Sequence, residues 1–360
     1  MQSIFSWLKN HERHLSALAM VAGFVTDNLV FSRIDLWQTQ AVFIGYITIC
    51  FVTIPLWHAL EIRAEQGKPS PRARLLLPLA TQFALGGFWS GFVIFYGRAA
   101  DWSSSWPFVL FLIAVFLGNE YFRRYHGRLV FTSVLFFLAL YAYAIFAIPI
   151  VTGTISRWTF LASGLGAIAV FALFTVLLRL FVRERFTHDI WRIRLGAFGV
   201  LALMNLFYFT SVLPPLPLAA PAAGIYHDVS RVAGTYQAVS EEESWRVRFL
   251  NFPRTLHVAP GEPLAAYSAV FAPTALTTAI THRWEWYDPR TKTWVLKAAI
   301  TYPIAGGRDD GYRGYSTVTV DKEGQWRVSV ITSDGLRIRR LPFTVAWTDT
   351  PLTLMTITLK

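Results

Sequence analysis

Side chains that could perform acid–base or metal chemistry are few in this chain, and they follow no known catalytic spacing. Residues 225–360 carry His227, His257, His282, Glu285, Asp309 and Asp310. These positions fit neither a Ser-His-Asp arrangement, nor HExxH, nor an EF-hand loop. Asp309 and Asp310 could hold a cation, or they could be part of a solvated polar hairpin. We expect His282 to be a pairing strand residue, so the sequence predicts no catalytic residue, no metal site and no cofactor.

A second group of polar side chains interrupts long apolar runs. These candidates for ligand binding within a membrane are Asp27, Gln82, Asn119, Glu120 and Asn205. A carboxylate at the centre of a bilayer costs about 2.5–3.5 kcal/mol on insertion scales and therefore calls for an explanation. Asp27 and Glu120 lie near opposite ends of their runs, so we do not expect them to share one site. Two interpretations stay open: hydrogen bonds between helices, or a proton or substrate pathway.

The elements that carry these residues are seven apolar runs, each long enough to cross a hydrocarbon core of about 30 Å. They cover residues 15–32, 41–58, 75–96, 106–122, 129–150, 159–180 and 195–213. Each must be a helix, because an open sheet leaves backbone groups unpaired in lipid. The first run lacks a small-residue cleavage site, so we expect a retained span and no signal peptide. His58, beside Glu61 at the end of the second run, is expected at the membrane interface and not as a ligand.

Basic residues predict the orientation of these runs. The N-terminal segment and the second, fourth and sixth connections carry 14 Lys and Arg residues, whereas the other three connections carry 3. The positive-inside rule then places the N-terminus in the cytoplasm and, after seven crossings, the C-terminal region in the periplasm. A missed or spurious helix would reverse that side. The net charge of +11 lies mainly in these connections, which favours membrane lipids over nucleic acid as partners.

Glycines and tryptophans add two expectations about the helices. Gly87 and Gly91 are four residues apart and allow close approach of another helix, either inside the bundle or in a homo-oligomer. Tryptophans are expected to flank the two membrane interfaces. They are Trp7, Trp57 and Trp191 on one side, and Trp37, Trp102, Trp106 and Trp158 on the other. The only cysteine, Cys50, lies within an apolar run, so no disulfide is expected.

The pattern changes after the Pro- and Ala-rich segment at residues 213–224. We expect a helical membrane domain over residues 1–213, a linker and connector over 214–250, and a β domain over 251–360. The β domain has seven candidate strands: 264–271, 281–287, 293–302, 314–320, 325–332, 336–346 and 352–359. Asp334-Gly335 is a two-residue hairpin signal. The predicted fold is an all-α membrane bundle of about seven helices followed by an all-β immunoglobulin-like sandwich.

A recurring motif within the β domain resembles the C-terminal domain family DUF2914. Its pattern is H-x-W, then R-x-x-S, then G-x-W-x-V and a closing D-G hairpin that ends in Phe. The matching residues are His282, Trp284, Arg313, Ser316, Gly324, Trp326, Val328, Asp334, Gly335 and Phe343. The apolar runs, with GFVTDNLVF in the first, resemble the multi-pass region DUF5924 that is often joined to this domain in proteobacterial membrane proteins. Neither resemblance implies an activity.

Three functions remain as hypotheses. The first is a non-enzymatic inner-membrane protein whose periplasmic domain binds an envelope protein or a glycan. The second is a transporter or channel that uses the intramembrane polar residues, although the runs show no internal repeat. The third is an intramembrane enzyme acting on lipid-linked substrates through basic cytoplasmic loops. We prefer the first, because a β domain rich in aromatic residues lacks a catalytic constellation.

Overall fold

The computed structural model describes residues 24–29, 31–67, 71–101, 103–121, 128–241, 254–274, 276–308 and 311–359. Most of the first apolar run, Trp7, Trp102, Asp309 and Asp310 lie outside these residues, as do the side chains of Asn119 and Glu120. The chain forms two compact units. The first comprises residues 1–97, 109–144 and 163–203, and the second comprises residues 98–108, 145–162 and 204–360.

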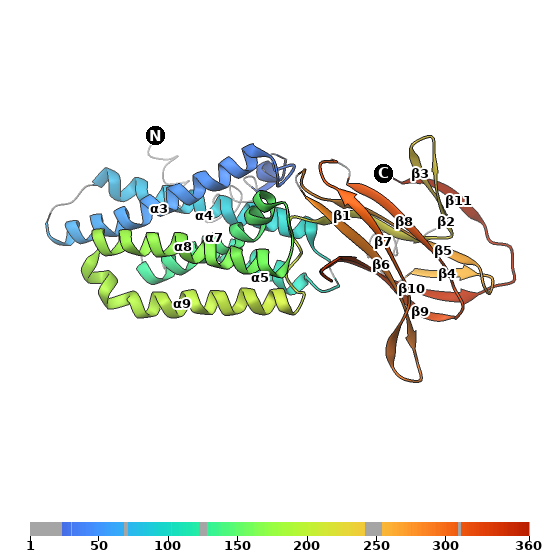
Figure 1. Ribbon diagram of the computed structural model, residues 1–360. Helices are drawn as coiled ribbons and strands as arrows, with labels where there is room; N and C mark the ends of the chain where they lie inside the picture. Colours follow the sequence, from blue (N-terminus) through green and yellow to red (C-terminus); the bar gives the residue numbers. More distant parts are fainter. Residues whose placement is uncertain are drawn as a thin grey trace, which may run out of the picture. The chain divides into compact units, whose positions relative to one another are not determined.

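Six helices follow a short helical stretch at residues 24–29 in the described part of the chain. They are α3 (Trp37–Glu65), α4 (Pro71–Ala99), α5 (Trp106–Tyr121), α7 (Leu129–Thr152), α8 (Arg157–Phe181) and α9 (Arg183–Phe209) (Figure 1). Among the described residues, five helices are long and apolar enough to cross a membrane, and α5 is a shorter apolar helix. These helices coincide with the second to seventh predicted runs.

Aromatic packing and a few interhelical hydrogen bonds hold the first unit together. Phe43 of α3 stacks on Phe92 of α4 with ring centroids 5.5 Å apart, and both side chains are fully buried. Thr53 and Thr81 join α3 to α4 through a 2.7 Å hydrogen bond. The hydroxyl of Tyr96 donates to the carbonyl of Ala142 at 2.9 Å and so joins α4 to α7. Such bonds give polar groups the hydrogen-bond partners that lipid does not provide.

The two glycines of α4 serve packing within the chain. A Cβ at Gly87 would collide with the ring of Tyr46, and a Cβ at Gly91 would collide with the ring of Phe43. Close approach of α3 and α4 therefore requires glycine at both positions. These contacts agree with packing inside the bundle, and the alternative, a homo-oligomer through these glycines, stays a prediction.

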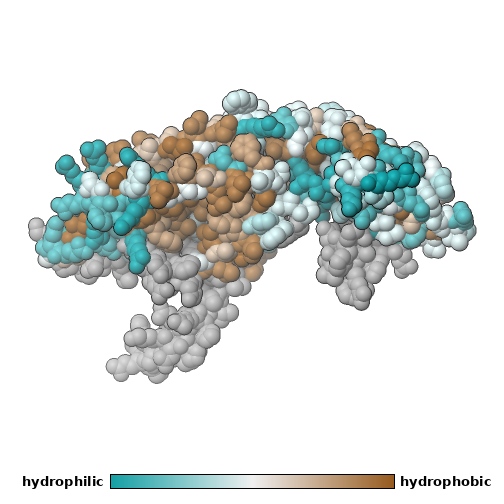
Figure 2. Space-filling view, turned by 90° about the horizontal axis from the view of Figure 1, so that it is seen from below, coloured by the Kyte–Doolittle hydropathy of each residue, from teal (hydrophilic) through white to brown (hydrophobic). Residues whose placement is uncertain are grey.

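Large apolar side chains cover the outer faces of α8 and α9. Leu165, Leu173 and Leu180 of α8 are 68%, 63% and 74% exposed, and Phe198 of α9 is 67% exposed. Figure 2 shows hydrophobic residues over much of the visible helical surface and a hydrophilic end. A surface of this kind is unfavourable in water and matches contact with lipid. Trp37 and Trp158 are also exposed, whereas Trp57 is buried and stacks on His58.

Helix α9 begins twelve residues before the run predicted at residues 195–213. Its first turns carry charged side chains, including Arg185, Asp189 and Arg192. The length of an apolar run predicts only the part of a helix that lipid can surround. A helix that continues into polar residues without a helix breaker is therefore longer than its apolar run. Arg185 forms ion pairs with Glu61 and Glu65 near the end of α3, which ties the two polar helix ends together.

The second unit contains eleven strands in three sheets among its described residues. One sheet has the order β1 (Ala219–Tyr226), β5 (Pro263–Phe271), β8 (Tyr312–Thr319). The largest has the order β4 (Arg254–Val258), β10 (Arg337–Trp347), β9 (Gly324–Thr332), β6 (Thr277–Asp288), β7 (Thr293–Ala305). The third has the order β11 (Leu354–Leu359), β3 (Thr235–Glu241), β2 (Asp228–Val232) (Figure 1).

The first two sheets share a hydrophobic core. Leu264 of β5 lies in one cluster with Trp284 of β6, Trp326 and Val328 of β9, and Phe343 of β10. All five side chains are at most 2% exposed. Trp326 and Val328 share a strand face because alternate residues of a strand point the same way, as the sequence predicts.

Three strands lie where the sequence predicts a linker and connector, so that expectation is wrong for residues 219–241. Strand β1 escapes detection because it contains Pro and Gly, which usually interrupt strands. It pairs only with β5, and its register shifts between Ala219 and Ala222, on either side of Pro221. An edge position with a bulge tolerates a proline that cannot donate a hydrogen bond.

The hairpin predicted at Asp334-Gly335 joins β9 to β10, but its loop is longer than two residues. The amide of Gly335 donates to the carbonyl of Thr332 at 2.9 Å, and the amide of Thr332 donates to the carbonyl of Leu336 at 2.9 Å. Gly335 has φ of 80°. This geometry is a three-residue loop with glycine in the left-handed region, a conformation that a side chain would strain.

Candidate functional site

A buried polar network in the β-rich region brings together three residues of the predicted motif. His282 of β6 is fully buried. Its Nδ1 lies 2.9 Å from the hydroxyl of Ser316 on β8, and its Nε2 lies 2.9 Å from the hydroxyl of Ser268 on β5. The indole N–H of Trp284 donates to Ser316 at 3.0 Å. The network therefore connects the two sheets that share the core.

The hydroxyl of Tyr302 on β7 completes this network, lying 2.8 Å from Ser268 and 3.1 Å from His282 Nε2. The Trp284 indole can only donate, so Ser316 accepts from it and keeps its own proton for Nδ1 of His282. That favours the histidine tautomer with its proton on Nε2. Burial lowers the pKa of His282 to about 4 and raises the pKa of Tyr302 to about 12. Both groups are therefore neutral near pH 7.

This network is suited to holding sheets together and not to catalysis. Both ring nitrogens of His282 already have partners inside the core, and a general base needs one nitrogen within reach of a substrate. A satisfied buried network specifies one packing arrangement, because each unpaired member would be costly. His282 and Ser316, expected as motif positions, are therefore core residues. Ser268 and Tyr302 escaped detection, because nothing in the sequence pairs them with residue 282.

The other motif positions also have structural surroundings. The indole N–H of Trp326 donates to the carbonyl of Lys322 at 2.9 Å. Arg313 lies on β8, where its carbonyl accepts from the hydroxyl of Tyr236 at 3.3 Å. Asp334 and Gly335 form the turn between β9 and β10. Together these positions define a strand pairing and a turn.

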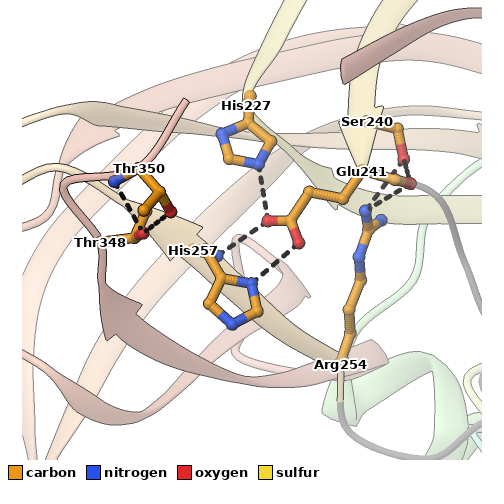
Figure 3. A network of polar contacts seen from close by, with 7 residues as sticks. All are labelled: His227, Ser240, Glu241, Arg254, His257, Thr348 and Thr350. Atoms are coloured by element: carbon orange, nitrogen blue, oxygen red, sulfur yellow. Dashed lines mark hydrogen bonds and ion pairs between the residues drawn. The ribbon is translucent and has the colours of Figure 1, made fainter. Parts of the chain in front are cut away.

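A second polar cluster surrounds the carboxylate of Glu241, at the end of β3. Nε2 of His227 lies 2.9 Å from Oε1, and the backbone amide of His257 donates to the same oxygen at 2.8 Å. Nδ1 of His257 lies 3.0 Å from Oε2. Figure 3 shows the two imidazoles on different sides of this carboxylate. Both histidines are candidate acid–base residues in the sequence, whereas Glu241 falls in the segment predicted to be a connector, so the sequence predicts no contact between them.

Hydrogen bonds to the charged carboxylate of Glu241 hold neighbouring strands together. Burial would raise the pKa of Glu241, but the hydrogen bonds that it accepts from His257 and His227 outweigh burial and lower its pKa. Arg254 of β4 donates to the hydroxyl of Ser240 at 3.0 Å and to the carbonyl of Glu241 at 3.2 Å. Ser240 is only 2% exposed. The cluster therefore joins β3, β4 and the turn that contains His227, and its one serine is already engaged.

A third charged group is Glu285 of β6, whose side chain is 5% exposed. Its carboxylate pairs with Arg327 Nε at 2.7 Å and with Arg283 Nη2 at 3.1 Å. Two arginine partners compensate the cost of removing this carboxylate from water, which an unpaired buried carboxylate would bear in full. The described residues contain no group of three or more His, Cys, Asp or Glu that could hold a metal ion.

The structure describes the side chains of three of the five intramembrane candidates. Asp27 is half-buried and lies near Ser90 and Tyr46. Gln82 of α4 is also half-buried, and Asn205 of α9 belongs to the other compact unit.

Comparison with known proteins identifies only the β-rich region. No curated protein matches the chain. A β-glucosidase from Listeria innocua in complex with glucose is 15% identical, with a TM-score of 0.20 over 31% of this chain. The chain spans only 16% of that enzyme. An alkylpurine DNA glycosylase from Pseudomonas fluorescens is 10% identical, with a TM-score of 0.20 over 85% of this chain and 96% of that one.

TM-scores this low show no shared fold, so neither enzyme informs the function of this chain. The resemblance of the helices to DUF5924 stays a prediction. Residues 277–345, which lie in β6 to β10, match the family model described as "Protein of unknown function (DUF2914)", so this part of the β-rich region is similar to that family.

Proposed function

We propose that this chain is a non-enzymatic, multi-pass inner-membrane protein whose periplasmic β domain binds an envelope protein or glycan. In this proposal the N-terminus and the basic connections are cytoplasmic, and the two sheets with a shared core form an immunoglobulin-like sandwich. Seven crossings place that sandwich on the other side of the membrane. Support for the membrane comes from five long apolar helices with exposed leucines.

Binding is favoured over catalysis because the motif residues are engaged inside the protein. His282, the one histidine of the motif, has hydrogen-bond partners on both ring nitrogens and is fully buried. This observation carries the proposal, since it removes the best acid–base candidate from contact with any substrate. What remains for function is the outer surface of the domain.

The hairpin of β6 and β7 offers the most distinctive surface. Arg327 lies over the ring of Trp294 at 4.1 Å, and Lys322 lies over the ring of Trp286 at 4.4 Å. Leu296 of β7 is 51% exposed. Strand β7 is the last strand of its sheet, so its outer edge can pair with an extended segment of a partner.

Site-specific crosslinking in living cells tests the proposal. A photo-reactive amino acid at Leu296 should give a defined adduct with an envelope component. Leu354 of β11 is a matched control, because it is 42% exposed on a different sheet. We expect a specific adduct from position 296 and none from position 354. Equal adducts from both positions, or none from 296, would contradict a binding role for this hairpin.

A further inference from the structure

The largest sheet carries a group of arginines on the face that points away from the shared core. Arg340 of β10, Ser329 of β9 and Arg283 of β6 lie opposite one another across three neighbouring strands. Val328 and Val330 belong to the core, so Ser329 and the side chains beside it point outward. Neighbouring strands are about 5 Å apart. The two arginine backbones are therefore about 10 Å apart, with a small serine between them.

The next residues on this face supply one carboxylate for three arginines. Glu285 and Arg327 lie opposite each other, two positions along from Arg283 and Ser329. Glu285 pairs with Arg327 at 2.7 Å and with Arg283 at 3.1 Å. Arg283, Arg327 and Arg340 therefore share a single carboxylate, which leaves two positive charges in excess.

Arg340 is the arginine of this group that lacks a partner. Its Nε is buried without a hydrogen bond, and its guanidinium forms no ion pair with any residue that the structure describes. Arg337, three residues earlier in β10, is by contrast paired with Asp101 at 3.2 Å. Burial, together with the nearby charges of Arg337 and Arg327, lowers the pKa of Arg340. A half-buried charge without a partner is costly, and an anion beside Arg340 would remove this cost.

We infer that Arg340, Ser329 and Arg283 bind a phosphate group of an envelope glycan. A phosphate monoester carries a charge of about −1.5 to −2 at pH 7, which matches the excess positive charge of this face. A guanidinium donates to two phosphate oxygens at once, and the Ser329 hydroxyl adds a donor between the two arginines. Ser329 is only 5% exposed, so it lies at the base of the site.

Aromatic side chains beside the arginines favour a sugar as the carrier of this phosphate. Arg327 lies over the ring of Trp294 at 4.1 Å, and the ring centroids of Trp294 and Tyr287 are 5.3 Å apart. Both rings are partly exposed. Trp and Tyr are common where one part of a contact is apolar and the other is wet, as with a sugar. The inference rests on the proposed function, because it names the ligand class for the same sheet.

Titration of the full-length protein in detergent tests this site, with isothermal titration calorimetry as the readout. Glucose 1-phosphate should bind more tightly than glycerol 1-phosphate or inorganic phosphate, and glucose should not bind. Arg340→Gln should weaken binding of glucose 1-phosphate about tenfold, as expected for the loss of one charged hydrogen-bond contact. Arg231→Gln, the same charge change at an exposed position of β2, should leave binding unchanged.

The melting temperature of Arg340→Gln shows whether the fold is kept, and Arg340→Lys provides a second variant. Lysine keeps the charge but loses the planar pair of donors, so Arg340→Lys should weaken binding less than Arg340→Gln does.

Three results would overturn the inference: no binding of glucose 1-phosphate, equal binding of glucose, or equal weakening by Arg231→Gln. Equal or tighter binding of glycerol 1-phosphate or inorganic phosphate would identify a lipid headgroup or a free anion and would overturn the assignment to a glycan. A specific crosslink from Leu296 without any binding of glucose 1-phosphate would overturn this inference alone and leave the proposed function intact.

Discussion

The helical part and the β-rich region each contain a fully buried histidine, and the two are used differently. His282 lies in the β-rich core, where Ser268 and Ser316 partner its ring nitrogens. His58 lines a cavity between helix ends, where neither nitrogen has a hydrogen bond among the described residues. Burial alone therefore does not indicate function. His282 is held by several hydrogen bonds inside a core, whereas the charged neighbour of His58 is Glu61, whose Oε2 lies 3.4 Å from Nδ1.

Replacing each histidine by leucine tests this contrast, and we expect it to give the largest change in the free energy of unfolding. His282→Leu should lower the free energy of unfolding by about 3 kcal/mol, because it leaves buried hydroxyls of Ser268 and Ser316 without their partner. His58→Leu should lower it by no more than about 1 kcal/mol, because it removes one long contact to Glu61, which keeps its ion pair with Arg185. Denaturant unfolding of the full chain in detergent measures both. The opposite order of the two effects would refute the contrast.

The stability of the β-rich region should depend on pH through His282. Its folded pKa of about 4 lies below the ordinary histidine value of about 6.5. Below pH 6.5 the unfolded chain takes up a proton that the folded chain does not, so stability falls as the pH is lowered toward 4. Wild type should lose about 3 kcal/mol over this range through this group.

The same experiment on His282→Gln provides the control for that pH dependence. The variant should be less stable at pH 7.5, and its difference from wild type should shrink by about 3 kcal/mol on acidification to pH 4. Parallel stability curves for the two proteins would show that His282 does not titrate as a buried neutral group.

Glu241 should contribute less to stability than His282, and its contribution should be lost in a lower pH range. Its pKa is lowered in the folded state, so its contribution is present above the ordinary glutamate value and is lost as the pH falls through the folded value. Glu241→Gln should lower the free energy of unfolding by about 1 kcal/mol at pH 7 and should reduce the pH dependence below about pH 4.5. Glu262→Gln, at an exposed position, is the control. Equal effects of the two substitutions would argue against a strand tie at Glu241.

Local patterns in the sequence predict most elements of this fold. Apolar length locates helices α3 to α9, and alternation in segments such as QWRVSVIT locates β5 to β11, because both signals repeat within one element. Strand β1 is not predicted from the sequence, because Pro221 usually argues against a strand and is tolerated here only at a sheet edge with a bulge. The start of α9 is not predicted either, because its first turns carry charged residues and lie outside the apolar run.

The polar clusters are harder to predict because they join distant parts of the chain. Arg185 and Glu61 are 124 residues apart, and His282 and Ser316 are 34 apart. No spacing rule relates such pairs, so basic residues that look scattered along the sequence gather around His58 only in the folded chain. His58 is expected beside Glu61 at the membrane interface, and the structure adds that its side chain is fully buried and lies 3.4 Å from Glu61 Oε2.

The proposed function places the connection between α3 and α4 and the β domain on opposite sides of a membrane. The natural Cys50 is buried, so single cysteines can be introduced at the exposed positions Gln66, between α3 and α4, and Arg290, between β6 and β7. Among the described residues, five helices lie between these positions, namely α4, α5, α7, α8 and α9, so the test does not depend on the first apolar run.

Labelling of these cysteines in spheroplasts with a membrane-impermeant maleimide is the most direct measurement. We predict that Arg290→Cys is labelled in intact spheroplasts, whereas Gln66→Cys is labelled only after the membrane is permeabilised. Labelling of both cysteines in intact spheroplasts, or of neither, would mean an even number of crossings between them and would contradict the account.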